Sequence, residues 1–303
     1  MTVQLPPGLV AYAARSPDFA RFLDGLPRLT AELVAQWRLV VDGPATHGFT
    51  ALVVPVRDPD GTPAVLKVGF PHPEAEHEHL ALRHWAGRGA VQLLRADPRR
   101  SALLLERLRS EDLTEQWDLE ACEVVGGLYA RLHVPAPPQL RTLTSYVETW
   151  TERLAALPRT APLPRRLVDQ AVCLGRDLAA DPAGVGTMLH GDLHYANVLA
   201  GDREPWLAID PKPVSGDPHY ELAPMLWNRW DELAGDVRRG VRARFHTLVD
   251  AGGLEEDRAR DWVVVRMLHL ALWRLEDPPG TVRVTPTDEL LTTCVSVAKA
   301  VQD

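Results

Sequence analysis

The sequence predicts an α+β fold of two lobes, with a small β-rich lobe at residues 1–108 and a larger helical lobe at residues 109–303. Three observations support this prediction. The chain has 303 residues, which is more than one ordinary compact core holds. Short apolar segments separated by turn residues occupy much of its first third. Long stretches with apolar residues at helical spacing follow from about residue 119 onward.

The N-terminal lobe is expected to begin with helices and to continue as a sheet. Apolar residues at helical spacing over residues 5–36 predict short helices, broken at Pro17 and Pro27. Strands are expected at residues 37–41, 51–56, 64–70, 91–95 and 101–106. One helix, at residues 74–85, falls between them, and Glu78, Leu82 and Trp85 share one of its faces.

The C-terminal lobe is expected to be mostly helical. Apolar periodicity predicts helices at residues 119–132, 143–157, 165–180, 222–233, 236–251 and 256–276. A Pro-rich run at residues 135–138 ends the first of these helices. A short apolar strand at residues 206–209 leads directly to Asp210.

The charge balance bears on the class of partner. The formal net charge is −8 at pH 7, with histidine neutral. A nucleic-acid-binding protein normally presents a basic face, so we expect no nucleic-acid partner. A cationic small molecule would be attracted by this charge, although solubility alone accounts for it equally well.

Cysteine usage and the apolar runs suggest a compartment. Cys122, Cys173 and Cys294 are far apart and show neither zinc spacing nor a disulfide framework, which fits a reducing cytoplasm. The first ten residues lack the pattern of a signal peptide, and no run of 18 apolar residues is present. We therefore expect a cytoplasmic protein with no membrane partner.

The most informative motif lies at residues 189–199. The catalytic loop of kinases has the pattern His-x-Asp, with Asn five residues after the Asp, and His190, Asp192 and Asn197 match it. An apolar strand ending in a metal-binding acid should come next, and the segment ending at Asp210 supplies it. The motif therefore predicts phosphoryl transfer.

The chemistry of phosphoryl transfer explains these residue types. Positioning and charge neutralisation matter most, so Asp192 is expected to orient the attacking hydroxyl and accept its proton as the catalytic base. Asn197 and Asp210 offer oxygen ligands, which suit Mg²⁺. Taken singly, Asp192 could cap a helix and Asn197 could be a turn residue, but their joint spacing favours the site. His190 is expected to hold the loop and to move no proton.

Upstream residues match a nucleotide site in the expected order. Lys67 lies in an apolar strand, where a buried ammonium group needs an anionic partner, and Glu78 or nucleotide phosphates would supply one. The loop at residues 43–50, with Gly48, could cover the phosphates with backbone N–H groups. The backbone of Glu106 and Leu108 could bond the nucleotide base. An exposed Lys67 and a solvated Glu78 are the alternatives.

Residues 190–222 resemble the aminoglycoside phosphotransferase family of antibiotic-resistance kinases. Residues 203–213, Gly216-Asp217-Pro218 and Tyr220-Glu221-Leu222 are most similar to its streptomycin 6-kinase and hydroxyurea phosphotransferase branch. The resemblance implies a protein-kinase-like fold, ATP or GTP with Mg²⁺ as cofactors, and a small hydroxylated acceptor. It also implies that Asp217 stabilises the catalytic loop.

The chain departs from the family pattern at two places. The usual Asp-Phe-Gly of kinases is Asp210-Pro211-Lys212 here, and Glu221 stands where an Asp is common. Both changes lie in the region expected to border the acceptor, so they leave the acceptor's identity open.

Acidic and amide side chains after the metal-binding acid are candidates for acceptor binding. A cationic aminocyclitol of the streptomycin type would meet carboxylates through charge-assisted hydrogen bonds. A surface acidic run is the alternative, and hydroxyurea or another small metabolite remains a possible acceptor. The candidates are Glu221, Asn228, Asp231 and Glu232.

Two other functions compete with the kinase. A metal-dependent hydrolase could use His190, Asp192, His194 and Asp210 as ligands, but this leaves Lys67 and Asn197 unexplained. A catalytically inactive kinase fold that only binds partners would not need the complete set of expected catalytic residues.

Overall fold

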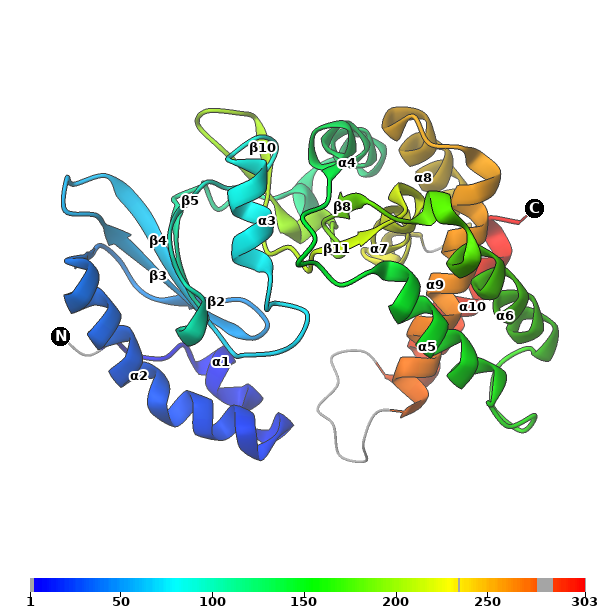
Figure 1. Cartoon of the computed structure of the whole chain (residues 1–303), viewed down its shortest axis with the longest axis horizontal. Helices are drawn as coiled ribbons and strands as arrows, with labels where there is room; N and C mark the ends of the chain where they lie inside the picture. The colour runs from blue at the N-terminus through cyan, green and yellow to red at the C-terminus, as the bar shows by residue number, and fades with distance from the viewer. Residues whose placement is uncertain (1–2, 234, 277–285, 303) are drawn as a thin grey trace. The chain divides into compact units, whose positions relative to one another are not determined.

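The computed structural model describes residues 3–233, 235–276 and 286–302 and confirms the α+β class (Figure 1). The chain forms two compact units, of which the first ends at Arg109 and the second begins at Ser110. In the part of the chain that the structure describes, no helix combines the length and apolar character needed to cross a membrane.

The first unit is an antiparallel sheet with helices packed against it. Its strands are β1 (Val40–Val41), β2 (Thr46–His47), β3 (Ala51–Arg57), β4 (Pro63–Gly69), β5 (Leu93–Asp97) and β6 (Ala102–Glu106). They are ordered β1-β3-β4-β6-β5, and β2 pairs with β3 as a short hairpin. Its helices are α1 (Pro7–Ala11), the 3-10 helices η1 (Tyr12–Arg15) and η2 (Pro98–Arg100), α2 (Pro17–Trp37) and α3 (Glu78–Trp85).

Successive side chains along each strand point to opposite faces of this sheet. Leu52 and Leu66 point to one face and pack in a core with Leu26 of α2, which Figure 1 shows running along the sheet. Lys67 follows Leu66 and therefore points to the opposite face. Its register partners are Val53 on β3 and Leu103 on β6.

Three expectations for the first unit are wrong in detail. Residues 37–41 are not one strand, because α2 continues to Trp37 and ends where Arg38 adopts a left-handed conformation with φ 56°. Pro27 lies inside α2 without ending it, since the buried Leu23 and Leu26 anchor the helix around it. The predicted helix at residues 74–85 begins only at Glu78, after a series of turns.

The second unit consists of helices around two small antiparallel sheets. Its helices are α4 (Asp118–Leu132), α5 (Leu143–Ala155), α6 (Arg165–Ala180), α7 (Ala223–Trp227), α8 (Val237–Gly252), α9 (Glu256–Glu276) and α10 (Thr287–Ala300). Short 3-10 helices are η3 (Leu113–Glu115), η4 (Pro182–Gly184), η5 (Tyr195–Asn197), η6 (Pro218–Leu222) and η7 (Trp230–Leu233). Its strands are β7 (Val134–Pro135), β8 (Thr187–Leu189), β9 (Val198–Ala200), β10 (Trp206–Ala208) and β11 (Val214–Gly216).

The two small sheets position the loops that carry the motif. β8 lies between β7 and β11, and β9 pairs with β10. Leu189, the last residue of β8, packs in a core with Tyr220 of η6 and Trp262 of α9. The strand ends are therefore anchored on buried apolar side chains.

The predicted helix at residues 222–233 is broken. α7 ends at Trp227, Asn228 is extended with ψ 156°, and Arg229 is left-handed with φ 52° before η7 begins. The break arises because buried Arg244 of α8 donates hydrogen bonds to the carbonyl oxygens of Asn228 and Arg229 at 2.7 and 3.1 Å. In a continuous helix, those carbonyl oxygens would instead accept hydrogen bonds from backbone amides of the next turn.

Candidate active site

The catalytic-loop motif and the segment around Asp210 come together through backbone hydrogen bonds. Asp192 and Asn197 lie between β8 and β9, and Asp210 lies between β10 and β11. The amide of Ile209 donates to Asn197 O at 2.9 Å, and the amide of Lys212 donates to His190 O at 2.7 Å. These two bonds bring the proposed base and both proposed metal ligands into one site.

Asn197 is oriented by its neighbours. Its side chain is nearly buried, and Nδ2 donates to Asp192 O at 2.8 Å. Because the amide nitrogen is held in this way, the side-chain oxygen is left for a cation. Asp210 adopts the left-handed region with φ 56°, which is uncommon for a residue other than glycine. Its Oδ2 accepts from Lys212 Nζ at 2.7 Å. Carboxylate and amide oxygens are the ligand types that fit Mg²⁺.

The surroundings of Asp192, the proposed base, shift the pKa of its carboxyl group. Burial raises the pKa of its carboxyl group, while His194, Lys212 and Arg266 lower it through their charges. A carboxylate with a raised pKa is a stronger proton acceptor than an ordinary aspartate at neutral pH.

His190 holds the catalytic loop through hydrogen bonds, as expected. It is completely buried; its Nε2 lies 2.9 Å from Ile209 O, and its Nδ1 accepts a hydrogen bond from the amide of Asp192 at 3.3 Å. Burial lowers the pKa of His190 to about 4, so the ring is neutral at physiological pH. A neutral ring bonded on both nitrogens fixes the loop and transfers no proton.

Buried charges hold Gly191 from two sides. Glu221 is completely buried, and its Oε1 accepts from the amide of Gly191 at 2.7 Å while its Oε2 accepts from the amide of His190 at 2.9 Å. On the other side, Arg266 of α9 donates to Gly191 O at 2.6 Å and to Tyr220 O at 2.7 Å. Gly191 has φ +82°, and a Cβ there would lie 2.2 Å from Lys212 O, so only glycine fits.

This geometry corrects the expectation that Glu221 binds the acceptor. A completely buried carboxylate with both oxygens bonded to backbone amides has no surface for a substrate. Its function is to hold the loop that carries Asp192. Arg266 was not among the expected site residues, although a lone arginine in the mostly apolar run from Trp262 to Leu272 was a usable signal.

Asp217 anchors the segment behind the loop. Trp262 Nε1 donates to its Oδ2 at 2.7 Å, Arg258 Nε donates to the same oxygen at 2.5 Å, and His219 Nδ1 lies 2.5 Å from its Oδ1. Burial alone would raise the pKa of Asp217, but the hydrogen bonds from His219 and Trp262 outweigh burial and lower it to about 2.

We expect Asp217→Asn to destabilise the protein in a pH-dependent way. The pKa is lowered from 3.8 to about 2, so the folded state favours the carboxylate. At about 1.4 kcal/mol per pKa unit, ionisation of this group contributes roughly 2–3 kcal/mol, present above pH 4 and lost as the pH falls toward 2. Urea unfolding of both proteins between pH 7 and 2.5 measures the difference. Asp250→Asn, an exposed acid on α8, is the control, and parallel curves for wild type and Asp217→Asn would contradict the expectation.

The remaining acceptor candidates lie around the break between α7 and η7. Asn228 is half-buried, and its Nδ2 donates to Pro224 O at 2.8 Å. Glu232 is exposed and forms an ion pair with Arg229 at 2.5 Å. Asp231 is exposed. Of the four candidates, Asp231 therefore offers its carboxylate most openly.

Tyr195 connects this segment with the catalytic loop. The guanidinium groups of Arg229 and Arg244 lie over its ring, 4.8 and 5.6 Å from the ring centroid. Its hydroxyl donates to Asp118 Oδ1 at 2.7 Å, and Arg244 Nε donates to Asp118 Oδ2 at 2.8 Å. The position of residues 228–232 is thus tied to η5, which carries Asn197.

The candidate nucleotide-binding residues all lie in the first unit. Lys67 Nζ lies 2.6 Å from Glu78 Oε1, so the expected ion pair is present, and both side chains are largely buried. Glu106 ends β6 and uses its own carboxylate to accept from the amide of Gln92 at 2.7 Å. The amide of Glu106 also donates to Gln92 O at 3.0 Å, so both groups hold the end of β6 against residue 92.

Arg107 and Gly48 lie next to or among the nucleotide-binding candidates. Arg107, which lies between Glu106 and Leu108, donates through its side chain to Asp42 Oδ2 at 2.9 Å and to Ala64 O at 3.2 Å, so it fastens the end of β6 to the sheet. Gly48 lies exposed at the tip of the β2–β3 hairpin, and a Cβ there would meet nothing within 4 Å. Within the described chain, no contact requires glycine at that place.

A family model described as aminoglycoside/hydroxyurea antibiotic resistance kinase matches residues 36–278. The chain belongs to this family. It is therefore a small-molecule kinase, as the resemblance implied.

Relatives and solved structures agree with this assignment. The kinase is 43% identical over 284 residues to a streptomycin 6-kinase of Streptomyces glaucescens, covering 91% of this chain and 92% of the relative. It is 44% identical over 287 residues to a hydroxyurea phosphotransferase of Kitasatospora aureofaciens, covering 91% and 81%. A crystal structure of a choline/ethanolamine kinase family protein from Mesorhizobium loti matches with a TM-score of 0.64 at 17% identity, covering 91% and 95%. This last likeness confirms the protein-kinase-like fold.

The interpretation as a metal-dependent hydrolase is wrong. The family match excludes it, and the geometry gives the reason, because His190 is buried with its Nε2 bonded to Ile209 O. Across the described ranges, no group of three or more His, Cys, Asp or Glu side chains could hold a metal ion.

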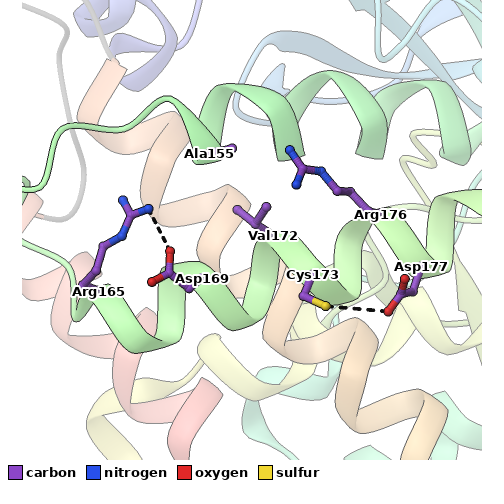
Figure 2. Close-up of a pocket in the computed structure, with 7 residues that line it drawn as sticks. All are labelled: Ala155, Arg165, Asp169, Val172, Cys173, Arg176 and Asp177. Carbon is purple, nitrogen blue, oxygen red and sulfur yellow. Dashed lines mark hydrogen bonds and ion pairs between the residues drawn. The ribbon is translucent and has the colours of Figure 1, made fainter.

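The kinase also has a surface cavity of about 390 Å³ on α5 and α6 (Figure 2). Arg165 pairs with Asp169 at 2.7 Å, and Cys173 Sγ lies 3.8 Å from Asp177 Oδ2. None of the proposed site residues lines this cavity. Arg176, which also lines it, pairs with Glu152 at 2.9 Å, so both arginines of the cavity have carboxylate partners and we do not assign the acceptor to it.

Proposed function

We propose that this kinase transfers the γ-phosphoryl group of ATP or GTP to a hydroxyl group of a cationic aminocyclitol of the streptomycin type, with Mg²⁺ as cofactor. The observation that carries the proposal is the convergence of Asp192, Asn197 and Asp210 through the backbone bonds at Ile209 and Lys212. A base and two oxygen ligands in one site are what phosphoryl transfer needs.

Asp192 orients the attacking hydroxyl and accepts its proton as the new P–O bond forms. Asn197 and Asp210 are the residues that would hold the metal. Bound nucleotide would supply the γ-phosphoryl group and leave as the nucleoside diphosphate when the bond from its β-phosphate oxygen to the γ-phosphorus breaks. Mg²⁺ would neutralise charge on the phosphates. Glu221 and Arg266 keep the backbone next to Asp192 in one conformation, which favours reaction through orientation.

The first unit supplies the nucleotide-binding residues in this proposal. Lys67, held by Glu78, contacts phosphate oxygens, and the N–H groups near Gly48 cover them. Backbone groups of Glu106 and Leu108 bond the base. Lys67 supports the assignment because a largely buried ammonium group on an apolar strand is destabilising unless anionic groups bind it.

Charge supports a cationic acceptor. The chain has a net charge of −8, and Asp231 and Glu232 expose carboxylates close in sequence to Asn228. Guanidinium groups bind carboxylates through short, charge-assisted hydrogen bonds. A small uncharged acceptor such as hydroxyurea, named for one of the relatives, is the second candidate.

Kinetics with both acceptors test the proposal. We expect turnover of streptomycin, and we expect Asp231→Asn to raise its KM roughly two- to fivefold with kcat little changed, because an exposed ion pair is worth about 1 kcal/mol or less. The measurement is nucleotide-dependent formation of phosphorylated product at varied acceptor concentration.

Asp250→Asn removes the same charge on α8 and serves as the control, with the wild-type KM expected. Phosphorylation of hydroxyurea without turnover of streptomycin would favour the second candidate. An unchanged streptomycin KM in Asp231→Asn would remove that carboxylate from the acceptor site.

We also propose that the kinase works in the cytoplasm. The proposal is supported by the sequence, in which Cys122, Cys173 and Cys294 are far apart and show no disulfide framework.

A further inference from the structure

The N-terminal helices contact the β2–β3 hairpin at its tip. The ring of Tyr12 in η1 lies 6.1 Å from the ring of His47 and 5.5 Å from the ring of Phe49, measured between centroids. These two residues flank Gly48. The match to the family model begins at residue 36, so Tyr12 lies outside the part of the chain that it covers.

A close approach from α1 supports the same contact. A Cβ at Gly8 would lie 2.3 Å from His47 Nε2, so the helix backbone packs directly against the imidazole ring. On its other side, His47 Nδ1 lies 2.9 Å from Gly48 O. The ring therefore joins α1 to the first residue of the hairpin tip.

The other end of the tip is also held by the N-terminal segment. The amide of Phe70 donates to Thr50 O at 2.8 Å. The ring of Phe70 lies 5.2 Å from that of Phe19 and 5.5 Å from that of Phe22, both in α2, with edge-to-face geometry. Both ends of residues 48–50 are thus connected to aromatic groups of residues 12–22.

We propose that the N-terminal segment at residues 7–22 is a working part of the nucleotide site, in which Tyr12 positions the hairpin tip for phosphate binding. The inference rests on the proposed function, which assigns the N–H groups near Gly48 to the phosphates. A glycine-containing tip loses conformational entropy when it becomes ordered on a ligand. Ring contacts that order it beforehand reduce this loss and tighten binding.

Removing the Tyr12 ring tests this assignment. We expect Tyr12→Ala to raise the KM for ATP roughly 5- to 30-fold, the range that loss of two aromatic contacts allows. The KM for the acceptor and kcat should stay near wild type, since Tyr12 is a positioning residue for the nucleotide loop alone. Tyr12→Leu keeps apolar bulk in the partly buried core and covers the case in which alanine loosens the fold.

Two controls separate positioning from general stability. Tyr12→Phe keeps the ring and should retain the wild-type KM. Leu29→Ala removes an apolar side chain of α2 that packs against the same core, so it should lower the Tm without changing the KM for ATP. A wild-type KM for ATP in folded Tyr12→Ala and Tyr12→Leu would overturn the proposal, and so would a KM raised equally by Leu29→Ala.

Hydrogen exchange gives a readout that needs no substrate. In Tyr12→Ala, the amides of residues 48–51 should exchange about tenfold faster than in wild type, while those of β4 keep their rates. Unchanged exchange at the tip would overturn the proposal. If wild type turned over no acceptor with ATP or GTP, the proposed function would fail, and the exchange result would still decide whether Tyr12 orders the tip.

Discussion

Asp192→Ala is expected to lower kcat/KM by about 10²–10⁴-fold, the range for loss of a positioned general base. The variant should keep its nucleotide affinity, because the nucleotide-binding residues of the proposal lie in the first unit. Steady-state kinetics together with nucleotide titration measure the two effects separately.

The stability of Asp192→Ala offers an independent check. A carboxylate whose pKa is raised by burial opposes folding at neutral pH, so its removal should leave the Tm unchanged or raise it. Lost activity with an intact or higher Tm identifies a residue kept for function. Wild-type turnover in the folded variant would show that Asp192 is not the base.

Asp210→Asn is expected to lower activity at ordinary Mg²⁺ concentration by more than about 100-fold. Residues that only support a metal ligand cost 10–100-fold when changed, so loss of a ligand charge should exceed that range. The fold should survive, because asparagine tolerates the left-handed conformation that residue 210 adopts with φ 56°. Kinetics over a range of Mg²⁺ and Mn²⁺ concentrations measure the effect.

The shape of the metal titration is the diagnostic feature for Asp210→Asn. Activity should recover in part at high metal concentration, whereas Asp192→Ala should not recover. Asp250→Asn serves again as the charge-matched control in the same unit and should retain the wild-type metal dependence. Full activity of Asp210→Asn at ordinary Mg²⁺ would remove this carboxylate from the site.

The surroundings of Gly191 explain how the loop can hold a base steadily. Glu221 accepts a hydrogen bond from the amide of Gly191, and Arg266 donates one to the carbonyl oxygen of Gly191. Buried groups of opposite charge therefore fix the same residue. Buried charges are strongly destabilising unless they are paired or hydrogen-bonded, and here backbone groups satisfy both. The same arrangement excludes Glu221 from acceptor binding, which leaves Asp231 as the acid to test first.

Short-range patterns made much of the candidate site predictable. The spacing of His190, Asp192 and Asn197, followed by an apolar strand and Asp210, indicated the chemistry, because a loop between two short strands presents its side chains in a regular order. The pair of Lys67 and Glu78 was predictable for the same kind of reason. A lone lysine in an apolar strand needs a partner, and the helix that follows supplies an inward-facing acid.

Other expectations failed where distant residues decided the outcome. Residues 222–233 have helical periodicity, but Arg244 of α8 takes the carbonyls of Asn228 and Arg229 and breaks the helix. The break places Asn228 and Asp231 in different local structures. Periodicity describes only neighbours along the chain, so it contains no information about a guanidinium group 15 residues away.

The sequence by itself determined the α+β class and the kinase chemistry and indicated the candidate residues for it, because those depend on local spacing and residue type. Only the tertiary structure decided that Glu221 and Arg266 hold Gly191, that Arg107 fastens the end of β6, and that Tyr12 contacts the hairpin tip. The physical reason is that a buried charge or an aromatic ring is stabilised by whatever group the folded chain brings within a few ångströms. That neighbour lies 30 residues away for Glu221, 75 for Arg266 and 65 for Arg107, so no local pattern could identify it.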